Sequence, residues 1–472
     1  MKTLSTAFVS LVMAVELHLM SAQPAHSIAA VKTNIPYLDA GPILETLRAD
    51  LLPVELRAMT PAERESAWPG WVSRHDSTIR ARLERGNEDS VVNLLLFGTT
   101  FTQRERATER DLAQLAGQPS EVPGLIIGRI EDLIAGIESP GTNARLQFAR
   151  QIVERREMDP TTAAGKNEIR RYVHESLMRI SREIAILSTR RLNDPTVELS
   201  ERLTRFRDRG LSSDTSLFAG FAVEEALDTI TVAGLVGAGS VRRVAIVGPG
   251  LDFTDKHEGY DFYPQQTIQP FAVIDSLMRL GLVIPDQFQV TTFDLSPRIN
   301  HHLEAARQRA RADGAYVLEL PRDMEAPWLP GLVTYWERFG DRIGEEVKAV
   351  AVPPGAGGVQ VRAVRVRPAV VMSIIPQDLN IVLQRLEPLA ADERFDLIIA
   401  TNILAYYDVF EQSLALVNVA KMLRPGGVFL TNNGVFELPT TPMQWVGDTD
   451  VTYMQLPAIG DTIDRVFWYR RQ

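Results

Sequence analysis

The chain has 472 residues, 45% of them hydrophobic, which is ordinary for globular proteins and long enough for two or three domains. Its formal net charge of -10 argues against nucleic acid as the main partner. The absence of cysteine excludes disulfides, thiolate catalysis and zinc–thiolate sites. No two of the seven histidines have His-x-x-x-His spacing, so we expect no metal site.

Residues 1–29 resemble a secretory signal peptide, since Lys2 is followed by the apolar run Ala7–Val15 and then by small residues. The run is interrupted by Glu16 and His18, so the alternative is an N-terminal helix that is not removed. It is too short to span a membrane, and we expect no other membrane segment. A cleaved segment predicts export to the periplasm or medium, and a retained one predicts a cytoplasmic protein.

Residues 30–236 have the pattern of an all-helical domain whose role the sequence does not state. Thr60 and Pro61 form a helix start, with Thr60 as the N-cap and Pro61 at the first helical position. Apolar residues recur at helical spacing in several segments. The predicted helical segments are 53–82, 87–97, 123–137, 144–156, 166–192 and 217–236.

Residues 237–472 change to alternating strand and helix patterns. The β-branched run Val244–Val247 ends at Gly248-Pro249-Gly250, as a buried parallel strand ends in a tight turn. The segments that follow are a helix at 268–280, a strand at 288–293, a helix at 301–311, strands at 370–375 and 395–400, a helix at 412–422, a strand at 428–431 and an antiparallel pair at 451–456 and 465–469. This pattern predicts an α/β fold with a doubly wound, Rossmann-like sheet and a C-terminal antiparallel pair.

The glycines at 237–239 offer a competing interpretation, a nicotinamide-dinucleotide fold. That fold requires a helix directly after the glycines. The residues at 241–247 are strand-like instead, so we interpret the glycines as a linker into the first strand.

Residues 241–469 resemble the class I S-adenosylmethionine-dependent methyltransferases. Within them, residues 395–430 are similar to the chemotaxis receptor methyltransferases and their relatives, most specifically in the turn Arg424-Pro-Gly-Gly427 before an apolar strand. The resemblance implies a seven-stranded sheet with S-adenosylmethionine over its first four strands.

The resemblance also implies roles for residues at the strand ends. It places Gly248 and Gly250 against the methionine portion, Asp294 on the ribose hydroxyls, Asp378 near the adenine amine, and Asn402 with Thr401 beside the transferring methyl. The expected cofactor-binding residues are Gly248, Pro249, Gly250, Asp252, Asp294, Leu295, Asp378, Leu379 and Asn402. A carboxylate suits the ribose position because it accepts hydrogen bonds from both hydroxyls. The alternatives are a helix cap for Asp294, a solvated acid for Asp378 and a turn residue for Asn402.

The sequence departs from the family pattern at three places. Ile246 stands where an acid usually precedes the glycine turn, and Asp252 stands at the third glycine position. Long insertions at 253–266 and 313–366 are candidate lids or substrate walls.

These observations predict methyl transfer from S-adenosylmethionine to an oxygen, or a nitrogen, of a small molecule or protein side chain. Such transfer needs alignment of the reactants more than acid–base groups. Thr401-Asn-Ile-Leu stands where amine-directed members have Asn-Pro-Pro-Tyr, which favours an oxygen acceptor by analogy. The alternative is a methyltransferase fold that has lost catalysis and serves as a binding or scaffold module.

Overall fold

The computed structural model describes residues 30–108, 111–112, 114–115, 122–189, 206–207, 209–254, 259–456 and 460–472. The signal-like segment 1–29 lies outside the described residues, as do residues 255–258 of the first insertion. Within the described ranges, none of the helices combines the length and apolar character needed to cross a membrane.

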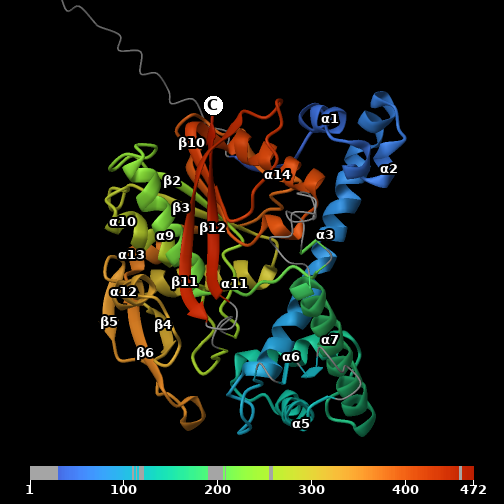
Figure 1. Cartoon of the computed structure of the whole chain (residues 1–472), viewed down its shortest axis with the longest axis vertical. Helices are drawn as coiled ribbons and strands as arrows, with labels where there is room; N and C mark the ends of the chain where they lie inside the picture. Colours follow the sequence, from blue (N-terminus) through green and yellow to red (C-terminus); the bar gives the residue numbers. More distant parts are fainter. Residues whose placement is uncertain are drawn as a thin grey trace, which may run out of the picture.

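A seven-stranded sheet forms the centre of the protein, in the order β11-β12-β10-β9-β2-β3-β7 (Figure 1). Its strands are β2 Arg243–Val247, β3 Gln289–Asp294, β7 Ile374–Asp378, β9 Phe395–Ala400, β10 Leu423–Thr431, β11 Met443–Leu456 and β12 Gly460–Arg471. The strands from β7 to β10 are parallel, whereas β12 is antiparallel to both β10 and β11. The predicted seven strands and C-terminal antiparallel pair are therefore confirmed.

The strand order reverses at β2. From β2 the chain moves outward to β3 and β7, and then returns to the other side of β2 to form β9 and β10. In open α/β sheets, ligands bind outside the carboxyl ends of the strands at such a reversal. The glycine turn lies directly after β2, so the topology places it at this position.

Helices cover both faces of the sheet, and two hydrophobic cores result. On one face, Val244 and Ile246 of β2 pack in the same core as α9, α10, α11 and α13. On the other face, Ala245 and Val247 pack in the same core as α1, α14 and the first half of α3. The alternation of side chains along β2 thus supplies both cores. The helices are α1 Tyr37–Thr46, α2 Val54–Arg57, α3 Pro61–Phe97, α5 Gly124–Glu138, α6 Ala144–Arg155, α7 Ala163–Thr189, α9 Leu217–Val232, α10 Gln269–Arg279, α11 Pro297–Arg311, α12 Pro330–Arg338, α13 Pro368–Met372 and α14 Val409–Met422, with short 3₁₀ turns at Ala49–Leu51, Pro354–Ala356 and Leu404–Tyr406.

Helix α3 is longer than the sequence predicts. The expected start is confirmed, because the Thr60 side chain accepts from the backbone of Glu63 and the Glu63 carboxylate accepts from the backbone of Thr60. Residues 53–60 of the first predicted segment precede α3, with Val54–Arg57 forming α2, and the rest of that segment is joined to the predicted segment 87–97 in one helix of 37 residues. In Figure 1 α3 runs from beside α1 and α2 to a lobe formed by α5, α6 and α7. That lobe packs on residues Val91–Leu96 and has its own hydrophobic core.

Contacts cross the predicted boundary at residue 236. Helix α9 lies in the same core as the sheet, although it precedes the boundary. The region 30–236 is also not entirely helical, since β1 Val31–Asn34 pairs with β8 Gln384–Glu387. Among the described residues before 236, the α5–α7 lobe with the end of α3 is the part that has a core of its own. The division at 236 stays a prediction, and this packing argues against it.

After residue 312 the structure corrects one predicted strand and shows how the second insertion is folded. The expected strand at 370–375 begins as helix α13, because Pro368 opens a helical turn that buries Val370 and Val371, and β7 begins only at Ile374. The insertion 313–366 forms a three-stranded antiparallel sheet with helix α12. Its strands are β4 Tyr316–Asp323, β5 Gly344–Val347 and β6 Val359–Val366, in the order β4-β6-β5.

Candidate functional site

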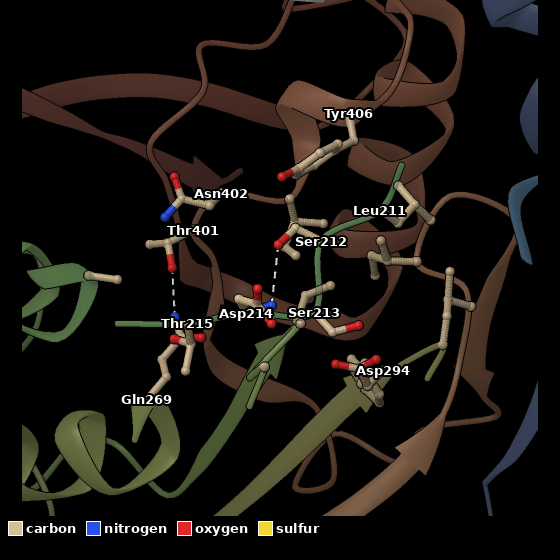
Figure 2. A pocket seen from close by; sticks show the side chains of 18 of the residues that line it. Leu211, Ser212, Ser213, Asp214, Thr215, Gln269, Asp294, Thr401, Asn402 and Tyr406 are labelled. Carbon is tan, nitrogen blue, oxygen red and sulfur yellow. Dashed lines mark hydrogen bonds between the residues drawn. The ribbon is translucent and has the colours of Figure 1, made fainter. Parts of the chain in front are cut away.

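A pocket opens at the carboxyl ends of β2, β3 and β9, as expected for this topology (Figure 2). It encloses about 830 Å³, including the space at its mouth. Its walls include Gly248 and Gly250 after β2, Asp294 and Leu295 at the end of β3, and Thr401 with Asn402 after β9. Leu379, directly after β7, also lines it.

The glycine turn has a conformation that other residues rarely adopt. Gly248 has φ 65° and Gly250 has φ 66°. A side chain at 248 would overlap Ile403, and one at 250 would lie 2.9 Å from the Ser213 carbonyl oxygen. The backbone conformation and the neighbouring atoms of the chain therefore both require glycine at positions 248 and 250, whether or not a ligand is bound.

Asp294 is buried at the end of β3 and lines the pocket. Its Oδ1 accepts a 2.8 Å hydrogen bond from the Ser296 backbone, at the start of α11. Burial raises the pKa of Asp294 to about 7, opposed by hydrogen bonds from the Ser296 and Gly250 backbones and by the charge of Arg298. Asp294 therefore lines the pocket, and the helix-cap alternative is not supported, because the N-cap of α11 is Ser296 and no side chain caps this helix.

Thr401 and Asn402 follow β9 and line the pocket, where hydrogen bonds fix their orientation. Gln269 Nε2 donates to Thr401 Oγ1 at 2.6 Å (Figure 2). The backbone of Asn402, which has φ 58°, donates to Asn432 Oδ1 at 2.7 Å. Asn432 Nδ2 in turn donates to Asn402 Oδ1 at 2.6 Å. Because the backbone donor fixes Asn432, the Nδ2 donor is the end of Asn402 that this pair leaves available.

One wall of the pocket was not predicted from the sequence. Residues Ser212–Ser216, here called the serine segment, cross the glycine turn. The Leu251 backbone donates to the Ser213 carbonyl at 2.7 Å, and the Thr215 backbone donates to the Leu251 carbonyl at 3.1 Å. The only sequence signal is a run of five small polar residues between two helical patterns, and its pairing partner lies about 37 residues away. Such long-range pairing leaves no periodic signal.

The charged side chains that line the pocket are both acidic. Asp214 and Asp294 line it, and none of the described residues lining it is Lys, Arg or His. Arg82 lies behind the wall, with its guanidinium 5.7 Å from the Tyr407 ring centre. Arg298 is also outside the lining residues, although it is near enough for its charge to act on both Asp214 and Asp294. The arrangement favours a ligand that carries positive charge.

Three predicted residues do not line the pocket. Pro249 is buried beside the turn. Asp252 is buried, and its Oδ2 accepts from Gln266 Nε2 at 3.0 Å. Asp378 is half exposed and forms ion pairs with Lys32 at 3.3 Å and Arg80 at 2.9 Å. Its carboxylate is therefore held by β1 and α3, away from the ligand space.

The insertions do not supply pocket walls. None of the described residues of 253–266 or 313–366 lines the pocket. Tyr260 and Tyr263 pack instead against Ala356, so the two insertions cover each other. Within the described parts of the chain, no group of three or more acidic or histidine side chains is arranged to hold a metal ion.

No protein-family profile and no curated protein matches the sequence. Several solved structures show a weak likeness. Magnesium protoporphyrin IX methyltransferase (ChlM) from Synechocystis PCC 6803, solved with bound SAM, is 10% identical, with 61% of this chain and 91% of that chain covered and a TM-score of 0.26. TrmN from Thermus thermophilus is 15% identical, with 65% and 68% covered and a TM-score of 0.25. The CcbJ methyltransferase from Streptomyces caelestis is 15% identical, with 56% and 81% covered and a TM-score of 0.20. At these scores the likenesses carry no weight, and the fold is assigned from strand order.

Proposed function

We propose that the chain is an S-adenosylmethionine-dependent methyltransferase that acts on an oxygen atom. The observation that carries this proposal is the charge of the pocket at the sheet's reversal point. Asp214 and Asp294 are the acidic residues that line it, with the pKa of Asp294 raised by burial to about 7, and the described lining residues include no cationic side chain. S-adenosylmethionine has a sulfonium and an α-ammonium group against one carboxylate, so it matches this field. The pyrophosphate of a nicotinamide dinucleotide is repelled by it.

The remaining lining residues fit the other parts of the cofactor. Asp294 ends β3 beside the glycine turn, where its carboxylate can accept from both ribose hydroxyls. Leu295, Leu379 and Ile381 offer an apolar surface for the adenine ring. Since Asp378 is paired with Lys32 and Arg80, we infer that adenine is held by these apolar contacts and not by that acid.

The residues Thr401 and Asn402 support an oxygen as the methyl acceptor. When bound, S-adenosylmethionine supplies an electrophilic methyl on sulfur. Asn402 presents its Nδ2 donor at the mouth of the pocket, since its Oδ1 is occupied by Asn432. Thr401 accepts from Gln269, which leaves its own hydroxyl proton to donate. Donors of this kind orient a carboxylate oxygen, which has lone pairs and accepts a methyl with no proton to lose, whereas an amine must release a proton to a base. This is why we propose an oxygen in preference to an amine.

The catalytic work of the chain is then alignment. Thr401 and Asn402 hold the acceptor oxygen, and the glycine turn and Asp294 hold the cofactor at a fixed distance from it. The pocket walls also exclude water, with Tyr406 and Tyr407 as buried parts of the lining.

Calorimetry of the purified chain with S-adenosylmethionine and S-adenosylhomocysteine tests the cofactor half of the proposal, and we expect both to bind. Mass spectrometry of proteins and metabolites after incubation with labelled cofactor tests the acceptor, and we expect the label on oxygen. Label on lysine or arginine nitrogen would contradict the acceptor, and failure of both compounds to bind would contradict the cofactor.

The second candidate is a binding module that has lost catalysis. It is favoured by Ile246, which is fully buried in the core where the family pattern has an acid. Binding of cofactor without transfer to any acceptor is the result that supports it over the enzyme.

A further inference from the structure

We propose that Asp214 is the anchor for a primary ammonium group at the glycine-turn end of the pocket, and that helix α3 completes the cofactor site by holding it. This deepens the function proposed above and rests on it. The ligand group is the α-ammonium of the methionine portion of the cofactor. Ser90 and Asn93 of α3 act as positioning residues through Asp214.

The position of Asp214 is set by the glycine turn. Asp214 forms a bridge with Leu251, the residue that follows Gly250. The hydrogen bonds on either side, from Leu251 to Ser213 and from Thr215 to Leu251, fix the serine segment in register with the turn. If the methionine portion lies against Gly248 and Gly250, Asp214 is the carboxylate beside its amino group, whereas Asp294 lies at the end of the neighbouring strand β3.

Ile246 stands where the family pattern has an acid before the glycine turn, and this departure supports the assignment of Asp214. Ile246 is fully buried in the hydrophobic core on one face of the sheet. Strand β2 contains no acidic residue and so offers no carboxylate at the turn. A carboxylate at the same turn is provided by the serine segment instead. An acid missing from one segment is thus present on another that packs against it.

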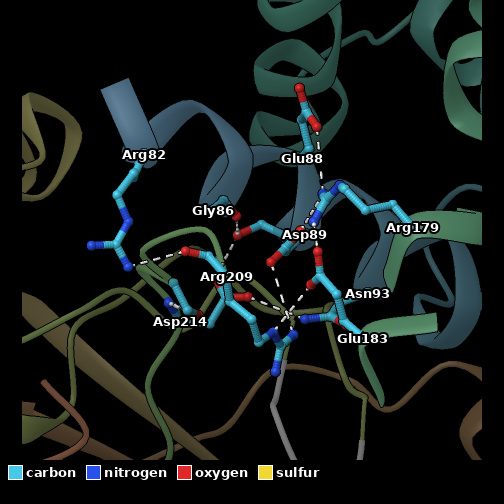
Figure 3. Close-up of polar contacts among 11 residues, drawn as sticks. Arg82, Gly86, Glu88, Asp89, Asn93, Arg179, Glu183, Arg209 and Asp214 are labelled. Atoms are coloured by element: carbon cyan, nitrogen blue, oxygen red, sulfur yellow. Dashed lines mark hydrogen bonds and ion pairs between the residues drawn. The ribbon is translucent and has the colours of Figure 1, made fainter. Parts of the chain in front are cut away.

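Helix α3 fixes the Asp214 carboxylate (Figure 3). Ser90 Oγ donates to Asp214 Oδ1 at 2.8 Å, and Asn93 Nδ2 lies 3.4 Å from Asp214 Oδ2. A carboxylate has about four lone-pair sites, so an ammonium group can bind it alongside neutral donors such as these.

The backbone of the segment is fixed by the same helix. A side chain at Gly86 of α3 would overlap the Leu211 carbonyl oxygen, so helix and segment touch through their main chains. Arg82 Nη2 also donates to the Arg209 carbonyl at 3.2 Å, and Arg209 pairs with Glu183 of α7 at 3.4 Å (Figure 3). The α5–α7 lobe is therefore connected to the cofactor pocket through α3 and this segment.

The test compares two nucleosides that differ at the proposed group. S-adenosylhomocysteine has the amino acid portion, whereas 5′-methylthioadenosine lacks it and keeps the ribose and adenine. Calorimetry with Asp214→Asn should show S-adenosylhomocysteine weakened about 10–100-fold, the usual range for a lost charged hydrogen bond, and 5′-methylthioadenosine unchanged. Asp341→Asn, the same chemical change in a turn outside the pocket, should alter neither.

The positioning role has its own measurement. Ser90→Ala and Asn93→Ala should each weaken S-adenosylhomocysteine by about 2–10-fold, as for a neutral hydrogen bond, and leave 5′-methylthioadenosine unchanged. Combined with Asp214→Asn they should add nothing further, because they act through that carboxylate.

The outcomes separate this inference from the function on which it rests. Equal weakening of both nucleosides in Asp214→Asn would show a structural role and overturn the inference, and so would no change in either. Both results leave the proposed function standing, since wild-type protein still binds the nucleosides. If wild-type protein binds neither nucleoside nor S-adenosylmethionine, the proposed function and the inference both fail.

Discussion

The two walls of the pocket are built in different ways. One wall comes from the ends of β2, β3 and β9, where each functional residue directly follows a strand. The other wall is the serine segment, which has no regular structure and is held by α3 on one side and by the glycine turn on the other. The first wall is set by local sequence and sheet order, and the second depends on packing between distant parts of the chain. Changes in the two walls should therefore have different effects.

The largest effect is expected in the strand-end wall. Asp294→Ala removes the proposed acceptor of the ribose hydroxyls and should weaken S-adenosylmethionine by about 1.5–3 kcal/mol, the usual range for a charged hydrogen bond. Calorimetry measures this directly. Unlike Asp214→Asn, the substitution should weaken 5′-methylthioadenosine as well, and an unchanged affinity for both would remove Asp294 from the site.

In the second wall, Gly86→Ala should act on stability and binding together. Its new Cβ meets the Leu211 carbonyl, a backbone atom that cannot rotate away, so the segment must shift. Overpacking of this kind lowers the free energy of unfolding by about 1–3 kcal/mol. Thermal unfolding and calorimetry should both show a loss. Gly124→Ala, at an exposed site of α5 with no atom within 4 Å of the new Cβ, is the matched control and should change neither. A stable Gly86→Ala protein with full affinity would mean that the segment does not depend on α3.

A smaller effect is expected from Asn432→Ala. The substitution removes the group that orients Asn402. One neutral hydrogen bond of this kind contributes about 0.5–1.5 kcal/mol of free energy. Cofactor affinity should be unchanged while the rate of methyl transfer falls. A lowered cofactor affinity at an unchanged rate would contradict the assignment of Asn402 to the acceptor side.

The smallest effect is a pH dependence of stability. The folded-state pKa of Asp294 is raised to about 7, above the ordinary value near 4 of the unfolded chain. Below pH 4 the carboxyl is protonated in both states, so it has no effect. As the pH rises from 4 to 7, the unfolded chain loses this proton first, which favours unfolding. Asp294→Asn has no proton to lose, so its melting temperature relative to wild type should rise by about 4 °C at most over this window and stay constant above it. A difference that is independent of pH would contradict the raised pKa.

The sequence by itself determined the strand-end wall. Gly248, Gly250, Asp294, Leu295, Leu379, Thr401 and Asn402 were predicted and line the pocket. They were predictable because parallel strands in a doubly wound sheet place their carboxyl ends at one edge, so residues after successive strands converge. The helix start at Thr60 was predictable for a similar reason, since a capping box lies within four residues.

Tertiary structure alone decided the rest. Asp378 follows a strand as Asp294 does, yet Lys32 and Arg80 from the start of the chain draw its carboxylate away from the pocket. Asp252 turns to Gln266, and the insertions pack on each other instead of covering the site. The serine segment became a wall only because Gly86 lets α3 approach its backbone and Leu251 pairs with it. These contacts join residues that are far apart in sequence, and neither propensity nor periodicity, which are local, can specify which distant partner a polar side chain meets.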